Sequence, residues 1–339
     1  KMYNSEKIKN ILYSKKNIVL LGHINPDGDA VGALIAFGGY LRGLSYNVTL
    51  ITPNEAPHFL RKLKDFHTIS DFSKNEALLI PKIEKADLIF CLDFNELDTR
   101  IGDVAMYALK NVKAQKVLID HHQNPPLDLY DAAVSDTNAS STCYLVFKIL
   151  EELGELDRIT QEMAEAIYVG MMTDTGNFSY GNLTPDLFRV LSVLVEKGAN
   201  PVALNSMVFN TQTESRMRLM GYVLYEKMEV TANGNAAYIA LSAGELRRFN
   251  YKSGDTEGLV NLPLSIADVT LSAIFIEMPD CIKISLRSRG ADAVDVNLFA
   301  RHYFVGGGHK NAAGAKFFGT LEDAVKQFEK GIDELKLEK

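Results

Sequence analysis

Short apolar runs alternate with amphipathic stretches through the first third of the chain. The runs at 18–22, 48–52, 88–93 and 117–120 have the length and composition of buried strands. Between the first two, residues 30–44 place apolar side chains at helical spacing. Strands that alternate with helices predict an α/β fold with a doubly wound, mainly parallel sheet.

A helical region follows, and then a second, smaller α/β unit. Residues 142–153 and 160–172 predict amphipathic helices, and helical character continues from 202 to about 228. After it, an Asn-Gly pair at 233–234 predicts a hairpin. Further strands are expected at 237–241, 269–276, 282–286 and 315–318, with helices near 294–303 and from 321. We therefore expect a first domain at 1–190, a helical connector at 191–225 and a second domain at 226–339.

Composition limits the class of protein. The chain has 339 residues, of which 47% are hydrophobic, which is enough for two domains with ordinary buried cores. No stretch approaches the roughly twenty apolar residues of a membrane span, and residues 1–16 lack a signal-peptide core, so we expect a cytoplasmic protein. Three well-separated cysteines favour reduced thiols over a disulfide or a zinc site. A formal net charge of −7 argues against a surface that coats long nucleic acid.

Acidic residues and histidines stand at the ends of the predicted strands. They are His23, Asp27 and Asp29 after the first run, Asp93 after the third, and Asp120, His121 and His122 after the fourth. The carboxyl ends of parallel strands meet at one edge of a sheet, so these side chains should converge, and Asp174 after the 160–172 helix would join them. Several carboxylates in one pocket must protonate or bind cations. Oxygen-rich ligands with two imidazoles favour manganese or a similar divalent ion, and their number suffices for two ions.

Each of these motifs also has a structural interpretation. Asn25-Pro-Asp-Gly28 is typical of a turn in which Asp27 caps the next helix. Asp93 would serve equally as a solvent-facing strand end, Thr173-Asp-Thr-Gly176 as an ordinary helix end, and a lone Asp-His-His as a hydrogen-bonded structural motif. One dinuclear metal site, by contrast, accounts for the position of every group.

Two stretches of the second domain favour phosphate binding. Gly306-Gly-Gly-His309, opening toward Ala312-Ala-Gly314, offers backbone amides, and a short helix starting there would add its positive end. A plain turn is the alternative. Ser285 and Arg287 share one face of a predicted strand and supply a hydroxyl and a planar guanidinium, although a solvated strand end would look the same.

Taken in order, the motifs resemble those of a known family. His23-x-x-x-Asp27-x-Asp29, Asp93, Asp120-His-His122 and Asp174 in Thr-Asp-Thr-Gly resemble the four phosphoesterase motifs of the DHH superfamily. The run from Gly306 resembles the signature of its associated C-terminal domain, so the resemblance covers about residues 18–318. The chain length is most similar to the nanoRNase and pAp-phosphatase branch, which degrades very short oligoribonucleotides and dephosphorylates 3′-phosphoadenosine 5′-phosphate.

The resemblance implies a role for each motif residue. His23 and Asp27 would bind one manganese ion, Asp29, His121 and Asp174 the other, and Asp93 would bridge the two. His122 would face the scissile phosphate, with Asp120 supporting it from behind. The substrate's other phosphate or terminal nucleotide would be held across an interdomain cleft by Ser285, Arg287, Ser288, Gly307, Gly308 and His309.

The expected function is that of a manganese-dependent phosphoesterase in which a metal-bridging hydroxide attacks phosphorus. Its expected partners are short oligoribonucleotides and nucleoside bisphosphate, without membrane or long nucleic acid. Phosphodiesterase activity on cyclic or linear dinucleotides, and exopolyphosphatase or pyrophosphatase activity, are alternatives for the same motifs. A nucleotide-binding regulator is the non-enzymatic alternative, which the completeness of the motifs disfavours. The sequence leaves the oligomeric state open, a homodimer included.

Overall fold

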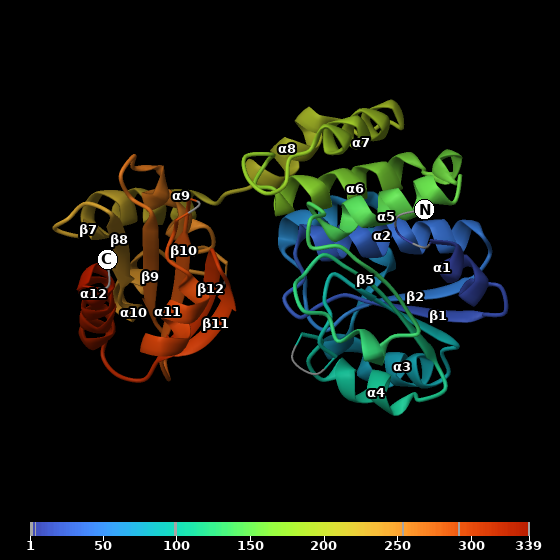
Figure 1. The fold of residues 1–339 in the computed structure, drawn as a ribbon, viewed down its shortest axis with the longest axis horizontal. Coiled ribbons are helices and arrows are strands. Elements are labelled where there is room, and N and C mark those ends of the chain that lie inside the picture. The colour runs from blue at the N-terminus through green and yellow to red at the C-terminus, as the bar shows by residue number, and fades with distance from the viewer. Residues whose placement is uncertain (1–2, 4, 98–99, 253, 291, 338–339) are drawn as a thin grey trace. The chain divides into compact units, whose positions relative to one another are not determined.

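The computed structural model describes residues 3, 5–97, 100–252, 254–290 and 292–337, and the side chains of residues 309, 336 and 337 lie outside this description. The chain divides into two units, Lys1–Thr211 and Gln212–Lys339 (Figure 1). The division falls within the segment 191–225 that the sequence predicts to be a connector.

The first unit contains a six-stranded parallel sheet. Its strands are β1 (Asn17–Leu21), β2 (Asn47–Thr52), β3 (Ile69–Asp71), β4 (Leu88–Leu92), β5 (Gln115–Asp120) and β6 (Ala132–Ser135). The order is β3-β2-β1-β4-β5-β6, and every neighbouring pair is parallel. The predicted doubly wound parallel sheet is therefore confirmed. The apolar pattern did not predict β3 and β6, because these strands have only three and four residues.

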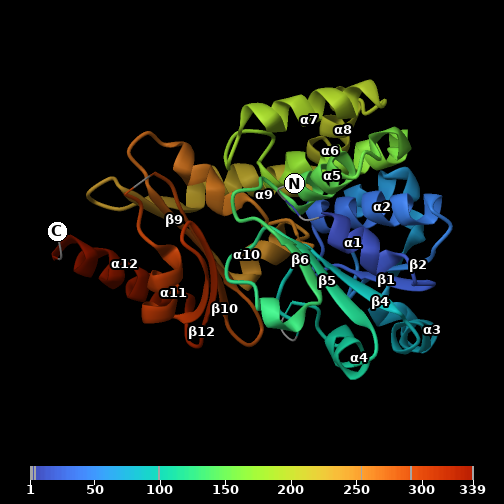
Figure 2. The same ribbon diagram turned by 45° about the vertical axis from the view of Figure 1, so that its right-hand side comes forward.

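Helices cover both faces of this sheet (Figure 1). They are α1 (Ser5–Leu12), α2 (Gly28–Gly43), α3 (Phe72–Glu84), α4 (Val104–Lys110), α5 (Thr142–Glu152), α6 (Gln161–Asp174), α7 (Pro185–Glu196) and α8 (Pro201–Phe209), with 3-10 turns at His58–Lys62, Lys64–Thr68, Leu127–Leu129 and Leu156–Arg158. Successive side chains of β1 point to opposite faces of the sheet and so belong to two cores. Ile18 and Leu20 pack with α2, α5 and α6, whereas Val19 and Leu21 pack with α3 and α4. Figure 2 shows α7 and α8 beyond α6.

Two glycines let α2, α5 and α6 approach closely. A Cβ at Gly28, the first residue of α2, would lie 2.3 Å from the Thr173 Oγ1, and one at Gly170 would lie 2.2 Å from the Cys143 Sγ. Neither site has room for a side chain. This packing brings Asp29, in the first turn of α2, beside Asp174, the last residue of α6.

The second unit contains a mixed six-stranded sheet of order β11-β12-β10-β9-β8-β7. Its strands are β7 (Met228–Val230), β8 (Ala236–Leu241), β9 (Leu271–Glu277), β10 (Ile282–Ser288), β11 (Val305–His309) and β12 (Ala312–Phe317). Its helices are α9 (Glu214–Tyr222), the π turn η5 (Val223–Lys227), α10 (Ala243–Arg248), the 3-10 helix η6 (Leu259–Ser265), α11 (Val296–Tyr303) and α12 (Leu321–Leu337). β8 and β9 run parallel and the other pairs antiparallel. This confirms a second, smaller α/β unit.

One sequence expectation is wrong. Gly306-Gly-Gly-His309 belongs to β11, an edge strand paired with β12, and no helix starts there. A Cβ at Gly306 would lie 2.2 Å from the Gly314 carbonyl oxygen, so glycine here allows two strands to pair closely. The helical character expected from 202 to about 228 is confirmed by α8, α9 and η5, with a break between α8 and α9 at 210–213.

None of the helices in the described part of the chain is both long enough and apolar enough to cross a membrane.

Candidate metal centre

The acidic and histidine motifs lie at the switch point of the first sheet. β1 pairs with β2 on one side and with β4 on the other, so the strand order reverses between β1 and β4. His23 follows β1, Asp93 follows β4, and His121 follows β5. Doubly wound sheets bind ligands at the carboxyl ends of the strands on either side of such a switch point.

Among the described residues the side chains form three overlapping groups of potential metal ligands, of which one, Asp93, His121 and His122, shares a residue with each of the other two. Ligand atoms of His23, Asp27 and Asp93 lie within 4.8 Å of one another, and so do those of Asp29, His121 and Asp174. The Asp93 Oδ2 lies 3.4 Å from the His23 Nε2, and its Oδ1 lies 3.5 Å from the His121 Nε2. Asp93 therefore faces His23 and His121 with different oxygens, as a bridging ligand requires.

Both histidines present the same nitrogen to the carboxylates. The His23 Nδ1 lies 2.8 Å from the Ile24 carbonyl oxygen, and the His121 Nδ1 lies 3.3 Å from that of Ala139. A proton on Nδ1 satisfies these carbonyls and leaves the Nε2 lone pair directed at the acids. Metal-ligating histidines are held in this way, with the non-ligating nitrogen donating to a carbonyl or carboxylate.

Asp27 has a structural and a ligand position at once. Its Oδ1 accepts hydrogen bonds from the backbone N–H groups of Asp29 (3.0 Å) and Ala30 (3.1 Å), so it caps α2. Its Oδ2 lies 3.7 Å from the His23 Nε2. The capping interpretation of this turn is correct, and it leaves one oxygen for the site.

The N-terminus of α5 holds the buried ligands from behind. The Asp29 Oδ2 accepts from the Thr142 N–H at 2.6 Å and its Oδ1 from the Cys143 N–H at 2.8 Å. The Thr142 hydroxyl donates to the Asp93 Oδ1 at 3.0 Å. The sequence does not identify Thr142 as a site residue. Its only signal is its position directly after Ser141, which caps α5.

Asp93 adopts a backbone conformation that few non-glycine residues adopt. Its φ is +65° and its side chain is buried. Asp tolerates the left-handed region better than most residues, but the conformation still carries strain, and such strain clusters at functional sites. Here it turns the carboxylate between the two histidines at the end of β4.

A separate hydrogen-bonded chain orients His122. Its Nδ1 donates to the Asp120 Oδ1 at 2.7 Å, and the Asp120 Oδ2 accepts from the Asn95 Nδ2 at 3.0 Å. The Tyr130 hydroxyl donates to the Asn95 carbonyl oxygen at 2.6 Å. Sequence reasoning missed Asn95 and Tyr130, because neither lies in a recognisable motif. The His122 Nδ1 also lies 3.8 Å from the Asp93 Oδ1, which places this imidazole beside the ligand groups.

The electrostatics of the cluster favour cation binding. Burial, and then the charge of Asp29, raises the pKa of Asp93 well above its ordinary value, and the same two causes raise the pKa of Asp174. Burial alone would lower the pKa of His23, but hydrogen bonds to Asp27 and Asp93 outweigh it and raise the pKa to about 11. Divalent cations would compensate four carboxylates without protonation, and the mixed oxygen and imidazole donor set fits them.

The substrate candidates of the second unit do not all share one face. Ser285 and Arg287 lie half-buried on one face of β10, whereas Ser288 is buried on the other and its Oγ accepts from the Asn311 Nδ2 at 3.1 Å. Gly307 and Gly308 lie on β11, where the Gly308 N–H donates to the Asn297 side chain at 2.9 Å. His309 is the last residue of β11, and its side chain lies outside the described structure.

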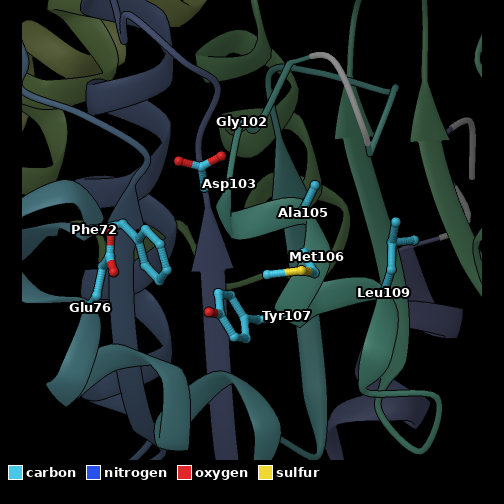
Figure 3. A pocket seen from close by; sticks show the side chains of 8 residues that line it. All are labelled: Phe72, Glu76, Gly102, Asp103, Ala105, Met106, Tyr107 and Leu109. Atoms are coloured by element: carbon cyan, nitrogen blue, oxygen red, sulfur yellow. The ribbon is translucent and has the colours of Figure 1, made fainter.

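A cavity of about 560 Å³ lies in the first unit (Figure 3). Its lining comes from α3, from α4 and from the turn before α4: Phe72, Glu76, Gly102, Asp103, Ala105, Met106, Tyr107 and Leu109. Its charged side chains are both carboxylates, Glu76 and Asp103, which disfavour an anionic ligand. We therefore place no phosphate-binding role there.

Comparison with known proteins agrees with this geometry. Residues 17–171 match the DHH family, N-terminal domain, and residues 233–336 match the DHHA1 domain. The crystal structure of an exopolyphosphatase-related protein from Bacteroides fragilis is 38% identical, with a TM-score of 0.93, and covers 97% of this chain and 95% of that one. The chain belongs to the DHH family.

Curated relatives extend over most of this DHH protein. The bifunctional oligoribonuclease and PAP phosphatase NrnA of Thermus thermophilus is 27% identical over 318 residues, which are 94% of this chain and 89% of the relative. The protein of the same name from Bacillus subtilis is 28% identical over 310 residues, 90% of each chain. The prediction that the chain is a phosphoesterase is confirmed at the level of its family.

Proposed function

We propose that this DHH protein is a manganese-dependent phosphoesterase that hydrolyses short oligoribonucleotides to mononucleotides and dephosphorylates 3′-phosphoadenosine 5′-phosphate. The observation that carries the proposal is the pair of ligand groups sharing Asp93, which suits two metal ions. The two NrnA relatives, matched over nine-tenths of this chain or more, support the substrate class.

In this proposal His23 and Asp27 would hold one ion, Asp29, His121 and Asp174 would hold the other, and Asp93 would contribute to both. When bound, two divalent ions would activate water and stabilise charge on the phosphoryl oxygens. The chain itself fixes the ligands beforehand, because backbone N–H groups hold Asp27 and Asp29 in place. Preorganisation of this kind lowers the cost of assembling the site.

His122 and Asp120 act on the substrate side of the proposed reaction. The Asp120 carboxylate accepts the Nδ1 proton of His122, so the Nε2 is the atom left to meet a phosphate oxygen. Burial raises the pKa of Asp120, but the hydrogen bond and charge of His122 outweigh burial and keep the carboxylate ionised. With Asp120 on its Nδ1, the His122 Nε2 would act on the scissile phosphate or leaving oxygen.

The second unit would recognise the rest of the substrate. Ser285 and Arg287 provide a hydroxyl and a guanidinium on one strand face, and Gly307 and Gly308 lie on β11, where the Asn297 side chain contacts the backbone. Ser288 would act through the strand backbone, since its own hydroxyl is bound by Asn311. We retain His309 in this group on the strength of its motif.

A cytoplasmic location is part of the same proposal. Cys91, Cys143 and Cys281 are all free thiols, and the first two are buried. Reduced cysteines suit a reducing compartment, where short oligoribonucleotides would also be met.

A second candidate, polyphosphate hydrolysis, rests on the name of the Bacteroides fragilis structure.

The test of both candidates uses metal-stripped protein with and without manganese. Substrates are 5′-labelled RNAs from dimers to long strands, 3′-phosphoadenosine 5′-phosphate, pyrophosphate and polyphosphate. Manganese-dependent turnover of dimers to pentamers and of the bisphosphate is expected. Phosphate release from polyphosphate alone would overturn the substrate and keep the metal site.

A further inference from the structure

One face of the second sheet has a covered half and an open half. Over β8 and β9, Ile239, Leu241 and Ile274 belong to the core formed with α9, η5, α10 and η6. Over β10, β12 and β11, the same face carries short or polar side chains. These positions are Lys283, Ser285 and Arg287 on β10, Ala312, Gly314 and Lys316 on β12, and Val305 and Gly307 on β11. We call them the β10–β12 strip. Figure 1 shows its strands at one edge of the sheet.

A pair of lysines lies at one end of the β10–β12 strip. Lys283 and Lys316 are direct partners across the antiparallel β10–β12 ladder, and both are exposed. Like charges directly opposite each other destabilise a sheet. Among the described residues, no carboxylate lies within ion-pair distance of either lysine, and none of the strip positions is acidic.

Protection against edge-to-edge pairing does not explain these lysines. Lysines often blunt edge strands, but β10 and β12 both have a neighbouring strand on each side. These two lysines lie on interior strands of the sheet and, within the described part of the chain, have no opposite charge beside them. In a chain of net charge −7, such a pair of cations indicates an anionic ligand.

Two exposed apolar residues are neighbours of Lys316, one across the β11–β12 ladder and one along the chain. Val305, the β11 partner of Lys316, is 66% exposed. Phe318, which lies two residues beyond Lys316 at the end of β12, is 67% exposed. Cations beside an exposed aromatic ring are the surface that single-stranded nucleic acid uses, with phosphates on the charges and a base stacked on the ring.

The two ends of the β10–β12 strip are too far apart to contact the same nucleotide. Arg287 and Lys283 lie four residues apart on β10, roughly 13 Å along the strand. We propose that Lys283, Lys316 and Phe318 bind the phosphates and a base of an oligoribonucleotide beyond the terminal nucleotide held at Arg287. This inference rests on the proposed function and adds a second subsite, which only the longer substrates reach.

The test compares two double variants with the same charge change. Lys283→Ala with Lys316→Ala removes the pair, whereas Lys326→Ala with Lys330→Ala removes two exposed lysines from α12, which packs on the other face. The probe is a 5′-labelled pentaribonucleotide, whose binding to the full chain is followed by fluorescence anisotropy in EDTA over a range of salt concentrations.

The strip variant should bind the pentamer at least about tenfold more weakly than wild type. The slope of log K against log salt should become shallower by roughly 1.4, since each phosphate contact to a single strand contributes about 0.7. Phe318→Ala should weaken the pentamer by about fivefold or more through lost stacking. KM for a dinucleotide and for 3′-phosphoadenosine 5′-phosphate should stay within about twofold of wild type, because those ligands end before the lysines.

Unchanged pentamer binding in the strip variant, or an equal loss in the α12 variant, would overturn the second subsite. Equal losses on the dimer and the pentamer would also overturn it, because the lysines would then act at the terminal nucleotide. A wild-type protein that binds the pentamer with the predicted salt dependence but hydrolyses no nucleotide with manganese would overturn the proposed function and keep the strip.

Discussion

The Asp29 Oδ2 accepts a 2.6 Å hydrogen bond from the backbone N–H of Thr142, 113 positions later in the chain. With the neighbouring Cys143 N–H on its Oδ1, this carboxylate meets the positive end of α5 with both oxygens. A buried charge is thereby satisfied by fixed dipoles, and lone pairs remain for a metal ion. The packing of α2, α5 and α6 is therefore part of the metal centre.

Gly170→Ala should disrupt the site from within this packing. The added Cβ would lie 2.2 Å from the Cys143 Sγ and 2.9 Å from the Asp29 Oδ1, so α5 and α6 must separate. Overpacking of this kind costs about 1–3 kcal/mol of stability. We expect a lower melting temperature and at least about tenfold weaker manganese binding by calorimetry.

Gly43→Ala is the matched control, since Gly43 is the last residue of α2 and a Cβ there meets no atom within 4 Å. It should leave manganese affinity unchanged and stability unchanged or raised by up to about 1 kcal/mol. Normal metal binding in Gly170→Ala would show that the approach of α5 to α6 does not set the ligand geometry.

Asp93→Asn should separate metal binding from folding. The Asp93 carboxylate is buried beside Asp29, and its raised pKa shows that its charge is unfavourable in the metal-free protein. We expect metal-free Asp93→Asn to melt at or above the wild-type temperature. The increase in melting temperature that manganese gives wild type should be largely lost, because the ligand groups around Asp93 lose their shared oxygen donor. A variant that manganese stabilises as strongly as wild type would exclude the bridging role.

The convergence of the ligands follows from features that sequence carries. His23, Asp93 and His121 each come directly after an apolar run, and parallel pairing places such residues at one edge without further information. Asp174 is predictable for a different reason: it stands at the end of a long amphipathic helix.

The supporting residues were not predictable, because they contact their partners across long stretches of the chain. Thr142 acts on Asp29 by its N–H and Asn95 on Asp120 by its amide, across 113 and 25 positions. The glycine run at 306–308, by contrast, led to a prediction that the structure does not bear out. Glycine composition suggests a phosphate loop, whereas the strand neighbours that exclude a Cβ become visible only when β11 and β12 pair.

Asp120→Asn should lower turnover without removing the metals. Asn keeps the size of the side chain but loses the charge that holds the His122 Nδ1–H at 2.7 Å. Removing a supporting partner of this kind typically costs about 10–100-fold in activity. We expect kcat for a dinucleotide to fall by this factor while manganese affinity changes by less than about threefold. Asn95→Ala, which removes the amide that donates to the other Asp120 oxygen and to the Gln123 carbonyl oxygen, should have a smaller effect in the same direction. A loss of metal binding equal to the loss of kcat would instead make Asp120 part of the ligand scaffold.

Glu245→Gln should change how the stability of the protein depends on pH. Glu245 accepts hydrogen bonds from the Tyr222 hydroxyl (2.5 Å) and the Ser242 N–H (2.8 Å), and it pairs with the Lys227 Nζ at 2.9 Å. Burial raises the pKa of Glu245, but these partners outweigh burial and lower it from 4.5 to about 2. Because the folded-state pKa is depressed, the stabilisation is present above about pH 4.5 and is lost as the pH falls toward 2.

The free energy of unfolding of wild type should therefore exceed that of Glu245→Gln by about 1–2 kcal/mol at pH 7, the usual size of hydrogen bonds to a charged group. The difference should shrink steadily below pH 4.5, as measured by chemical denaturation at a series of pH values. Glu229→Gln, an exposed site on β7, is the control and should track wild type throughout. A stability difference between Glu245→Gln and wild type that stays constant from pH 7 to pH 3 would mean that packing and capping, not the charge of Glu245, stabilise this region.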